Sequence, residues 1–365
     1  MKIFSDPKKD VSMPDKGEGG YEWWYFDAVD PTSGCSVVII FYDGNPFSRR
    51  YVRYLEGNNG SVKPLPSNFP AISISVYRQG VPIYYSFTEY EPEKALFGSE
   101  VPNLKIGRHS MIGQAEQNNG ASRYHVHLEE ELPSGDAIYA DLTFKGDSIE
   151  MPAGHSETNE TEAPGQGHLW NLVQPRAEVT GTINLTGGER IAFQGTGYHD
   201  HNTGYEPMKE EFVDWYWGRY HFPESTLVYY VMNRRNVQQH SAWLIGHQGD
   251  RGILHFSNAS LSDYGLSLFG LKSARKISFA KEGTEIIIQQ STTMDNGPFY
   301  QRFGSEAYMK KDNGVMQKAA GLSEYIHPER IYWRLFWPLV NMRIRYRAEG
   351  PHWVQKSKRL YRWTW

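Results

Sequence analysis

The sequence predicts an all-β protein built from two tandem antiparallel β-barrel domains. Short alternating runs separated by turn signals recur along the chain, helix signals are scarce, and aromatic residues make up 14% of the 365 residues. Aromatic side chains pack well on pleated sheets, and regularly spaced hairpins are typical of antiparallel barrels or sandwiches. The length suggests about two domains.

The expected strands follow one another along the chain, and most pair with the next across a short turn. The first clear strand is the apolar run at 36–42, which ends at the turn signal Asp43-Gly44-Asn45-Pro46. Hairpins are expected at 71–77 with 82–90, 124–132 with 137–144, 177–185 with 191–197, 212–221 with 226–233, 242–247 with 252–256 and 276–280 with 285–290. The connecting residues are mostly types that favour turns.

Two stretches depart from this pattern. Residues 146–167 are rich in Gly, Pro, Ser, Thr and Glu, and we interpret them as an exposed loop. Residues 341–365 hold seven basic residues and one acidic residue, with aromatic residues between them. Such interleaving can mark contact with nucleic acid or a membrane surface. The alternation of Arg343, Arg345 and Arg347 with apolar residues instead favours a half-exposed strand.

Composition narrows the function classes. The net charge of −4 gives no global sign of a nucleic-acid partner. The single cysteine, Cys35, excludes an internal disulfide. The first residues lack the apolar run of a secretory signal, and no stretch approaches the ~20 apolar residues that span a bilayer. We therefore expect a soluble, cytoplasmic protein.

An echo between two segments predicts the domain boundary. An acidic residue followed by Trp and further aromatic residues occurs at 22–25 and again at 214–217, about half a chain later. Two barrels of one kind in tandem would produce such an echo. We place the boundary near Gly204, which gives an N-terminal domain at 1–204 and a C-terminal domain at 205–365.

Two short segments carry the most informative chemistry. One residue separates His168 from Trp170, and one residue separates Tyr198 from Asp200. In an extended strand, alternate side chains share a face. An acid, an imidazole, a phenol and an indole that converge on one pocket suit proton-driven chemistry on an apolar, electron-rich substrate. The same pattern also fits ordinary barrel residues whose buried polar groups are satisfied by hydrogen bonds.

These four side chains meet only if the hairpin that carries them is irregular. Pairing Leu185 with Arg190 around the glycine turn would place Asp200 opposite Pro175. Trp170 would then lie five residues further on, ~17 Å away along a straight strand. We therefore predict a bend near Pro175, where proline interrupts a strand in any case.

His199 and His201 flank Asp200 and would point to the other side of a strand. A metal site is one interpretation, but no further ligand sits at a recognisable spacing. We expect both histidines to hydrogen-bond to the backbone and to fix the loop that carries Asp200. No metal is predicted.

Several motifs follow one another along the chain: Glu22-Trp23-Trp24-Tyr25-Phe26-Asp27-Ala28, Asn45-Pro46-Phe47-Ser48, His168-x-Trp170 and Gly197-Tyr198-x-Asp200-His201-Asn202-x-Gly204. Taken together, they resemble the carotenoid 1,2-hydratase and AttH-like group, which is related to lipocalin-fold Diels–Alderases. The resemblance covers the first part of the chain, to about residue 220, and is vague beyond it. It implies two consecutive lipocalin-like domains with a ligand pocket, and chemistry that needs no metal or organic cofactor.

In the hydratases of this group the His-x-Trp and Tyr-x-Asp pairs are the proposed catalytic residues, which correspond here to His168, Trp170, Tyr198 and Asp200. Asp200 would be the acid that protonates an alkene carbon, kept neutral by burial among aromatic rings. Trp170 would stabilise the resulting tertiary carbocation through its π-face. Tyr198 and His168 would hold the acid's proton or position the attacking water.

We expect four further residues to contact the substrate: Glu22, Trp24, Trp215 and Trp217. The expected activity is that of a cofactor-independent lyase or cyclase that protonates an isoprenoid or polyene and completes the reaction by water addition or ring closure. A pericyclase that works by confinement, and a non-catalytic carrier of a hydrophobic small molecule, stay open as alternatives. The expected partner is a hydrophobic small molecule and not a nucleic acid, and peripheral contact with a membrane stays open.

Overall fold

The computed structural model describes the chain except residues 58–64, 116–120, 151–166, 236, 248–251 and 313. The chain forms two compact units. Unit 1 comprises Met1–Pro207 together with Arg334–Trp365, and unit 2 comprises Met208–Trp333. The first break lies close to the predicted boundary at Gly204. Residues 334–365 belong to unit 1 and not to the predicted C-terminal domain at 205–365.

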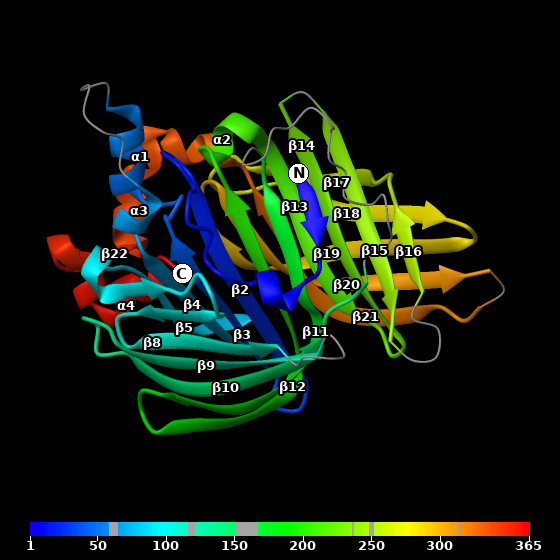
Figure 1. The fold of residues 1–365 in the computed structure, drawn as a ribbon, viewed down its shortest axis with the longest axis horizontal. Coiled ribbons are helices and arrows are strands. Elements are labelled where there is room, and N and C mark those ends of the chain that lie inside the picture. The colour runs from blue at the N-terminus through cyan, green and yellow to red at the C-terminus, as the bar shows by residue number, and fades with distance from the viewer. Residues whose placement is uncertain (58–64, 116–120, 151–166, 236, 248–251, 313) are drawn as a thin grey trace. The chain divides into compact units, whose positions relative to one another are not determined.

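Unit 1 is a lipocalin-like barrel made from one long, curled antiparallel sheet (Figure 1). Its strands are β1 (Lys2–Phe4), β2 (Tyr21–Asp30), β3 (Cys35–Asp43), β4 (Ala71–Arg78), β5 (Val81–Glu89), β6 (Ala95–Phe97), β7 (Asn103–Ile106), β8 (His109–Ala115), β9 (Ala121–Glu131), β10 (Ala137–Asp147), β11 (Leu169–Leu185), β12 (Glu189–Gly204) and β22 (Arg345–Tyr346). They pair in the order β22-β5-β4-β3-β2-β12-β11-β10-β9-β8-β7-β6. β1 runs parallel to β11, and β22 runs parallel to β5.

Ring contacts between distant strands show which face of this sheet lies inside the barrel. Trp24 on β2 stacks on Phe97 of β6 with ring centroids 5.7 Å apart, and Phe26 contacts Tyr124 of β9 at 5.9 Å. Because successive side chains of a strand alternate between faces, Trp23 and Tyr25 point to the other face of β2. We call these the inner and the outer face of the sheet.

The described residues also form short α-helices: α1 (Arg49–Glu56), α2 (Met208–Glu211), α3 (Trp337–Arg343) and α4 (Lys358–Trp363). α1, α3 and α4 belong to unit 1, where α1 packs against α3 (Figure 1). The strand predicted where Arg343, Arg345 and Arg347 alternate with apolar residues is confirmed only at Arg345–Tyr346, which pair with β5, whereas Arg343 ends α3. Pro338 lies at the start of α3, where the fixed φ of proline suits the first turn of a helix. The predicted alternation holds only locally, where Ile344 and Tyr346 are buried.

The C-terminal segment, residues 334–365, also joins two parts of the barrel that are distant in the sheet order. β22 lies along the free edge of β5. Arg345 donates to the Glu131 carbonyl at the end of β9, at 3.3 Å. On α4, Lys358 and Arg362 both pair with Asp136 in the turn between β9 and β10, at 2.9 and 3.1 Å. The end of the chain thus closes a seam between β5 and the β9–β10 hairpin.

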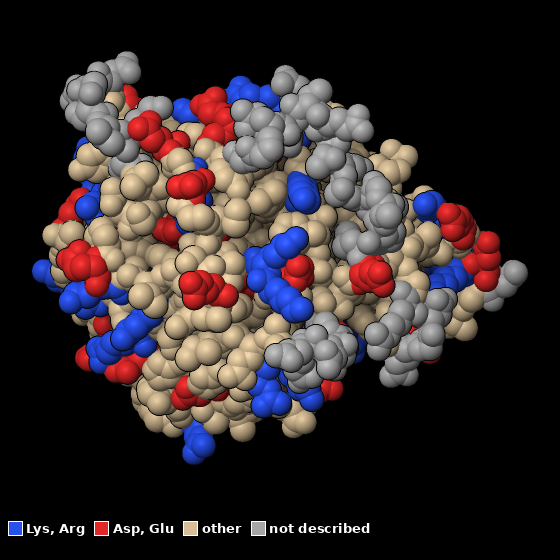
Figure 2. All heavy atoms as spheres, in the orientation of Figure 1, with Lys and Arg blue, Asp and Glu red and all other residues tan. Residues whose placement is uncertain are grey.

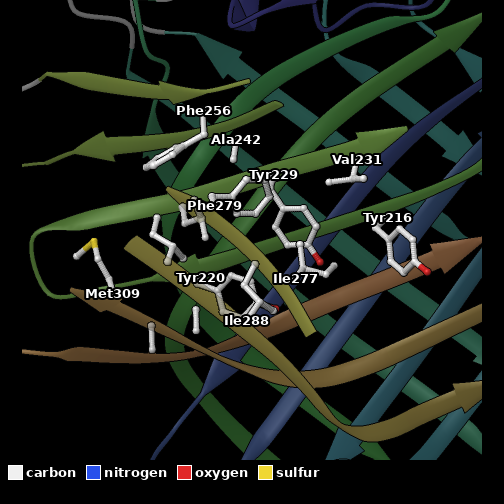
Figure 3. Packing of buried hydrophobic residues seen from close by; sticks show 14 of the residues in the cluster. Tyr216, Tyr220, Tyr229, Val231, Ala242, Phe256, Ile277, Phe279, Ile288 and Met309 are labelled. Carbon is white, nitrogen blue, oxygen red and sulfur yellow. The ribbon is translucent and has the colours of Figure 1, made fainter. Parts of the chain in front are cut away.

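Unit 2 is built on a second antiparallel sheet, which is also curled. Its strands are β13 (Phe212–His221), β14 (Ser225–Arg234), β15 (Gln238–Gly246), β16 (Ile253–Phe256), β17 (Ser260–Leu266), β18 (Lys272–Lys281), β19 (Thr284–Asn296), β20 (Tyr300–Lys311) and β21 (Gln317–Ile326). They pair in the order β16-β15-β14-β13-β21-β20-β19-β18-β17. Figure 3 shows the core of this unit, where Tyr216 and Tyr220 of β13 and Tyr229 of β14 pack among Phe279, Ile288 and other buried residues.

The structure confirms the all-β fold and each of the expected hairpins. Most of the predicted loop at 146–167 lies outside the described residues. Among the described residues, no helix combines the length and the apolar character needed to cross a membrane. Figure 2 shows acidic and basic side chains interspersed over one face of the molecule.

Candidate active site

Asp200 lies near the end of β12, which runs between β2 and β11 in the sheet of unit 1. Its side chain is on the outer face, and Tyr25 of β2 lies opposite it in the register. Alternate residues of β12 share this face, so Tyr198 and Asn202 flank the carboxyl. All three β12 side chains are buried, and Asp200 is 3% exposed. The carboxyl is therefore in dry surroundings that include aromatic rings.

Three uncharged donors converge on this carboxyl group. The indole Nε1–H of Trp170 and the phenol of Tyr198 both donate to Asp200 Oδ2, each at 2.7 Å. The side-chain amide of Asn202 donates to Oδ1 at 2.9 Å. The structure therefore brings three of the four predicted catalytic residues into direct contact, and it adds Asn202.

The remaining residue, His168, reaches Asp200 through Asn202. Its Nε2 lies 2.9 Å from Asn202 Oδ1, and its Nδ1 lies 3.1 Å from the Tyr21 hydroxyl. In this amide orientation Asn202 Oδ1 can only accept, so Nε2 carries the hydrogen and Nδ1 accepts from Tyr21. A directed chain of hydrogen bonds thus runs from Tyr21 through His168 and Asn202 to Asp200.

Two register shifts in β11 explain how Trp170 reaches the carboxyl. The pairing of β11 with β12 shifts twice between residues 171 and 177, with Pro175 inside the shifted stretch. Trp170 consequently lies opposite Asn202, two residues from Asp200 on the neighbouring strand. The predicted irregularity at Pro175 is confirmed. However, β11 continues through it as one bulged strand instead of turning back.

The outer face also holds residues that the sequence analysis did not single out. Extending the i, i+2 spacing of Tyr198 and Asp200 by one more step would have found Asn202. The others, Tyr21, Tyr25 and Asp27, are on β2, and Asp27 lies directly opposite Tyr198. The sequence does not indicate that β2 pairs with β12, so residue spacing alone could not place Tyr21, Tyr25 and Asp27 beside Asp200.

Glu22 and Trp24, two of the predicted substrate contacts, are on the inner face of the same sheet. Trp24 stacks on His201 with ring centroids 4.3 Å apart. The Glu22 carboxylate lies 2.8 Å from His201 Nε2 and 2.8 Å from Lys16 Nζ. Glu22 and Trp24 therefore do not line the same space as Asp200. Because strand side chains alternate between faces, the alternation that places Tyr198 and Asn202 beside Asp200 also places Glu22 and Trp24 on the opposite face of the sheet.

The inner face carries a buried ionic network. Asp10 lies 2.9 Å from His199 and 3.1 Å from His201, and Lys16 also pairs with Asp43 at 2.6 Å. Burial alone would raise the pKa of Asp10, but the two histidines outweigh it and lower the pKa to about 2. Burial would lower the pKa of His201, but Glu22 and Asp10 raise it to about 9. The network therefore holds a protonated His201 at neutral pH.

The expected role of the two histidines is correct for one of them. His199 Nδ1 lies 2.9 Å from the Tyr25 carbonyl, which is the backbone contact that we predict. His201 instead bridges two carboxylates, and Asp200 lies within a strand and not in a loop. By anchoring β12 on its inner face, both histidines fix the strand that presents Asp200 on the outer face.

Trp215 and Trp217, the other two predicted substrate contacts, are on β13 of unit 2, and each is 5% exposed. Tyr216 and Tyr220 on this strand belong to the core of unit 2. Because strand side chains alternate, the two tryptophans point away from that core.

Two lipocalin-like barrels, the first of which carries a buried carboxyl group held by indole, phenol and amide donors, define a lipocalin-like double-barrel protein. The family model of the carotenoid hydratase CrtC matches residues 60–353, and the chain belongs to this family. It is 29% identical over 348 residues to a hydroxyneurosporene dehydrogenase from Chlorobaculum tepidum, a match that covers 92% of this chain and 90% of the relative. It is 26% identical over 221 residues to an acyclic carotenoid 1,2-hydratase from Thiocapsa roseopersicina, with 60% of this chain and 49% of that relative covered.

Solved structures show the same fold. A protein assigned as AttH from Nitrosomonas europaea superposes with a TM-score of 0.57 and 14% identity, covering 88% of this chain and 98% of the other. Kievitone hydratase from Nectria haematococca gives a TM-score of 0.52 and 11% identity, with 89% and 96% covered. At these identities the likeness concerns the fold alone.

Proposed function

We propose that the protein is a hydratase that adds water across an isolated, trisubstituted double bond of an isoprenoid polyene. Family membership supports a hydratase-type or related activity. The substrate class is drawn from the acyclic carotenoid named for several relatives. The observation that carries the proposal is the buried Asp200 carboxyl and its contacts with Trp170, Tyr198 and Asn202.

The first step is proton transfer from neutral Asp200 to an alkene carbon. Oδ2 accepts from both an indole and a phenol, so in the neutral acid it is the carbonyl oxygen and Oδ1 carries the proton. The Asn202 amide can serve this state by rotating, so that its oxygen accepts from Oδ1–H and its nitrogen donates to His168 Nε2. His168 then carries its hydrogen on Nδ1 and donates to the Tyr21 hydroxyl, which can donate or accept.

The relay of Tyr21, His168 and Asn202 thus has two orientations, one for each charge state of Asp200. In one orientation Asn202 donates to the carboxylate, and in the other it accepts from the acid. Both satisfy every hydrogen bond along the chain. The relay therefore lets Asp200 lose a proton to the substrate and regain one without leaving a buried polar group unpaired, which would cost ~1–3 kcal/mol.

The second step captures the carbocation. Protonation of the less substituted carbon leaves a tertiary cation, which the π-face of Trp170 stabilises by ~2 kcal/mol or more in a dry site. A water molecule positioned by Tyr198 forms the new C–O bond, and its surplus proton returns to the Asp200 carboxylate. The net change is the addition of one water to the double bond, and the acid is regenerated. The role of Trp215 and Trp217 as substrate contacts stays a prediction from the sequence.

The test is incubation of the purified protein with an acyclic carotenoid in water enriched in 18O and, separately, in D2O. The proposal expects a tertiary alcohol that carries one 18O atom, or one deuterium on the adjacent carbon. A rearranged or cyclised product of unchanged mass would favour the cyclase or pericyclase alternative. Tight binding without any product would favour the carrier.

A further inference from the structure

The exposed side of α4 and the turn before it combine tryptophans with positive charge. Trp353 is 64% exposed, Trp363 is 77% exposed and Leu360 is 40% exposed. Lys356 and Arg359 lie among them and are also exposed. We call these five residues the terminal surface.

The geometry of α4 places three members of the terminal surface side by side. Tyr361 is buried, and Lys358 and Arg362 turn toward Asp136. At 100° per residue, the remaining helix positions, Arg359, Leu360 and Trp363, occupy one continuous arc on the opposite side. α4 also contacts the turn that contains Trp353 and Lys356, and that turn contacts α3. The helix and the turn that carry the terminal surface are therefore both held against other parts of unit 1.

We infer that the terminal surface binds the headgroup region of an anionic lipid bilayer. Tryptophan favours this zone because its ring is apolar and its N–H is polar. Lysine and arginine beside it are attracted to anionic lipids. Residues 334–365 as a whole hold eight basic residues and one acidic residue, so the segment that carries the terminal surface has a net positive charge.

The outer face of the sheet links the terminal surface to the candidate active site. In the register, Tyr198 on β12 is followed across the sheet by Asp27, Val38, Ser75 and Tyr85 on β2, β3, β4 and β5. Directly opposed residues of antiparallel strands share a face, and four strand spacings correspond to about 19 Å.

Tyr85 is the last residue of this row. Its ring centroid lies 6.4 Å from that of Tyr361 and 6.2 Å from that of Trp365. The C-terminal segment that carries the terminal surface therefore packs against the same sheet face that carries Asp200. A hydrophobic polyene dissolves in bilayers, so a protein that acts on it gains from docking there. The idea that the protein meets its substrate in the bilayer rests on the proposed function, whereas the binding of the terminal surface to a bilayer does not.

The test is co-sedimentation of the full-length protein with vesicles of phosphatidylcholine alone and of phosphatidylcholine mixed with phosphatidylglycerol. The inference expects binding to the mixed vesicles that weakens as salt is raised. At roughly a fivefold loss per charge, K356Q/R359Q should bind them roughly 30-fold more weakly. W353S/W363S should lose binding to the mixed vesicles. L268S is the matched control, because Leu268 is 95% exposed on unit 2, and it should bind like the parent protein.

Unchanged vesicle binding by W353S/W363S would overturn the inference, as would binding of a DNA duplex with no binding to vesicles. Turnover separates this result from the proposed function. With detergent-dispersed substrate, W353S/W363S should match the parent protein, whereas with substrate embedded in mixed vesicles its rate should fall with its binding. Absence of turnover in the parent protein under both conditions would count against the proposed function and leave the vesicle result standing.

Discussion

Replacing Asp200 with asparagine should abolish turnover while leaving the fold intact. An amide has one acceptor oxygen where the carboxyl has two. If that oxygen takes the place of Oδ2, it keeps the hydrogen bonds from Trp170 and Tyr198. The new NH2 group then faces Asn202, which can rotate to accept from it once the rest of the relay reverses. We therefore expect D200N to lose no more than about 1 kcal/mol of unfolding free energy.

The expected effect on turnover is much larger. A positioned general acid typically contributes 10²–10⁴-fold to a rate. Here its proton forms the first new bond, so we expect the upper part of that range, a fall in kcat of about 10³–10⁴-fold. At ~1.36 kcal/mol per tenfold, this corresponds to roughly 4–5 kcal/mol of transition-state stabilisation.

The assay is single-turnover 18O incorporation into an acyclic carotenoid, with urea unfolding measured on the same samples. D263N, the same change at an exposed aspartate of unit 2, serves as the matched control and should keep the parent rate. A D200N protein that retains more than about a tenth of the parent kcat would refute the acid role, and confinement would then be the better account of catalysis. Unfolded D200N would instead refute the reversible relay.

Three further results are expected. W170F keeps an aromatic face but removes the Nε1–H donor to Asp200; kcat should fall about 10- to 100-fold, and an unchanged kcat would contradict this role. H201Q leaves the buried Glu22 without its partner ring; urea unfolding should show a loss of about 3–5 kcal/mol, and a loss under 1 kcal/mol would contradict the network. Because the pKa of His201 is raised to about 9 in the folded protein, its contribution is complete below about pH 6.5 and is lost as pH rises through 9. Unfolding free energy should fall over that interval by on the order of 3 kcal/mol in the parent protein but not in H201Q.

Strand alternation and turn chemistry are local properties, and these account for what the sequence predicts well. The hairpins, the shared face of Tyr198 and Asp200, and the irregularity at Pro175 all follow from a few neighbouring residues. The direct contact of Trp170 with Asp200 needed in addition the resemblance to a known family, because the register alone would have kept them apart.

What the sequence could not predict depends on pairing between distant segments. Glu22 and Trp24 are close to Asp200 in sequence motifs but lie on the opposite face of the sheet, and only the pairing of β2 with β12 reveals this. The pairing of Asp10 with His199 spans most of unit 1. The helices after residue 334 were not predicted. Basic and apolar residues alternate there over a few positions, which is the pattern of a strand, and the strand that forms is the short β22.

The discontinuity of unit 1 has a consequence for synthesis on the ribosome. All residues around Asp200 are translated before residue 208, yet the segment that closes the seam beside β5 is translated only after unit 2. At ~5–20 residues per second, the nascent first barrel waits on the order of ten seconds for it. Unit 2 is continuous and can complete its own sheet during that delay. The order of maturation is therefore the reverse of the order of translation, and the incomplete barrel is the stage at which chaperones would have the most to protect.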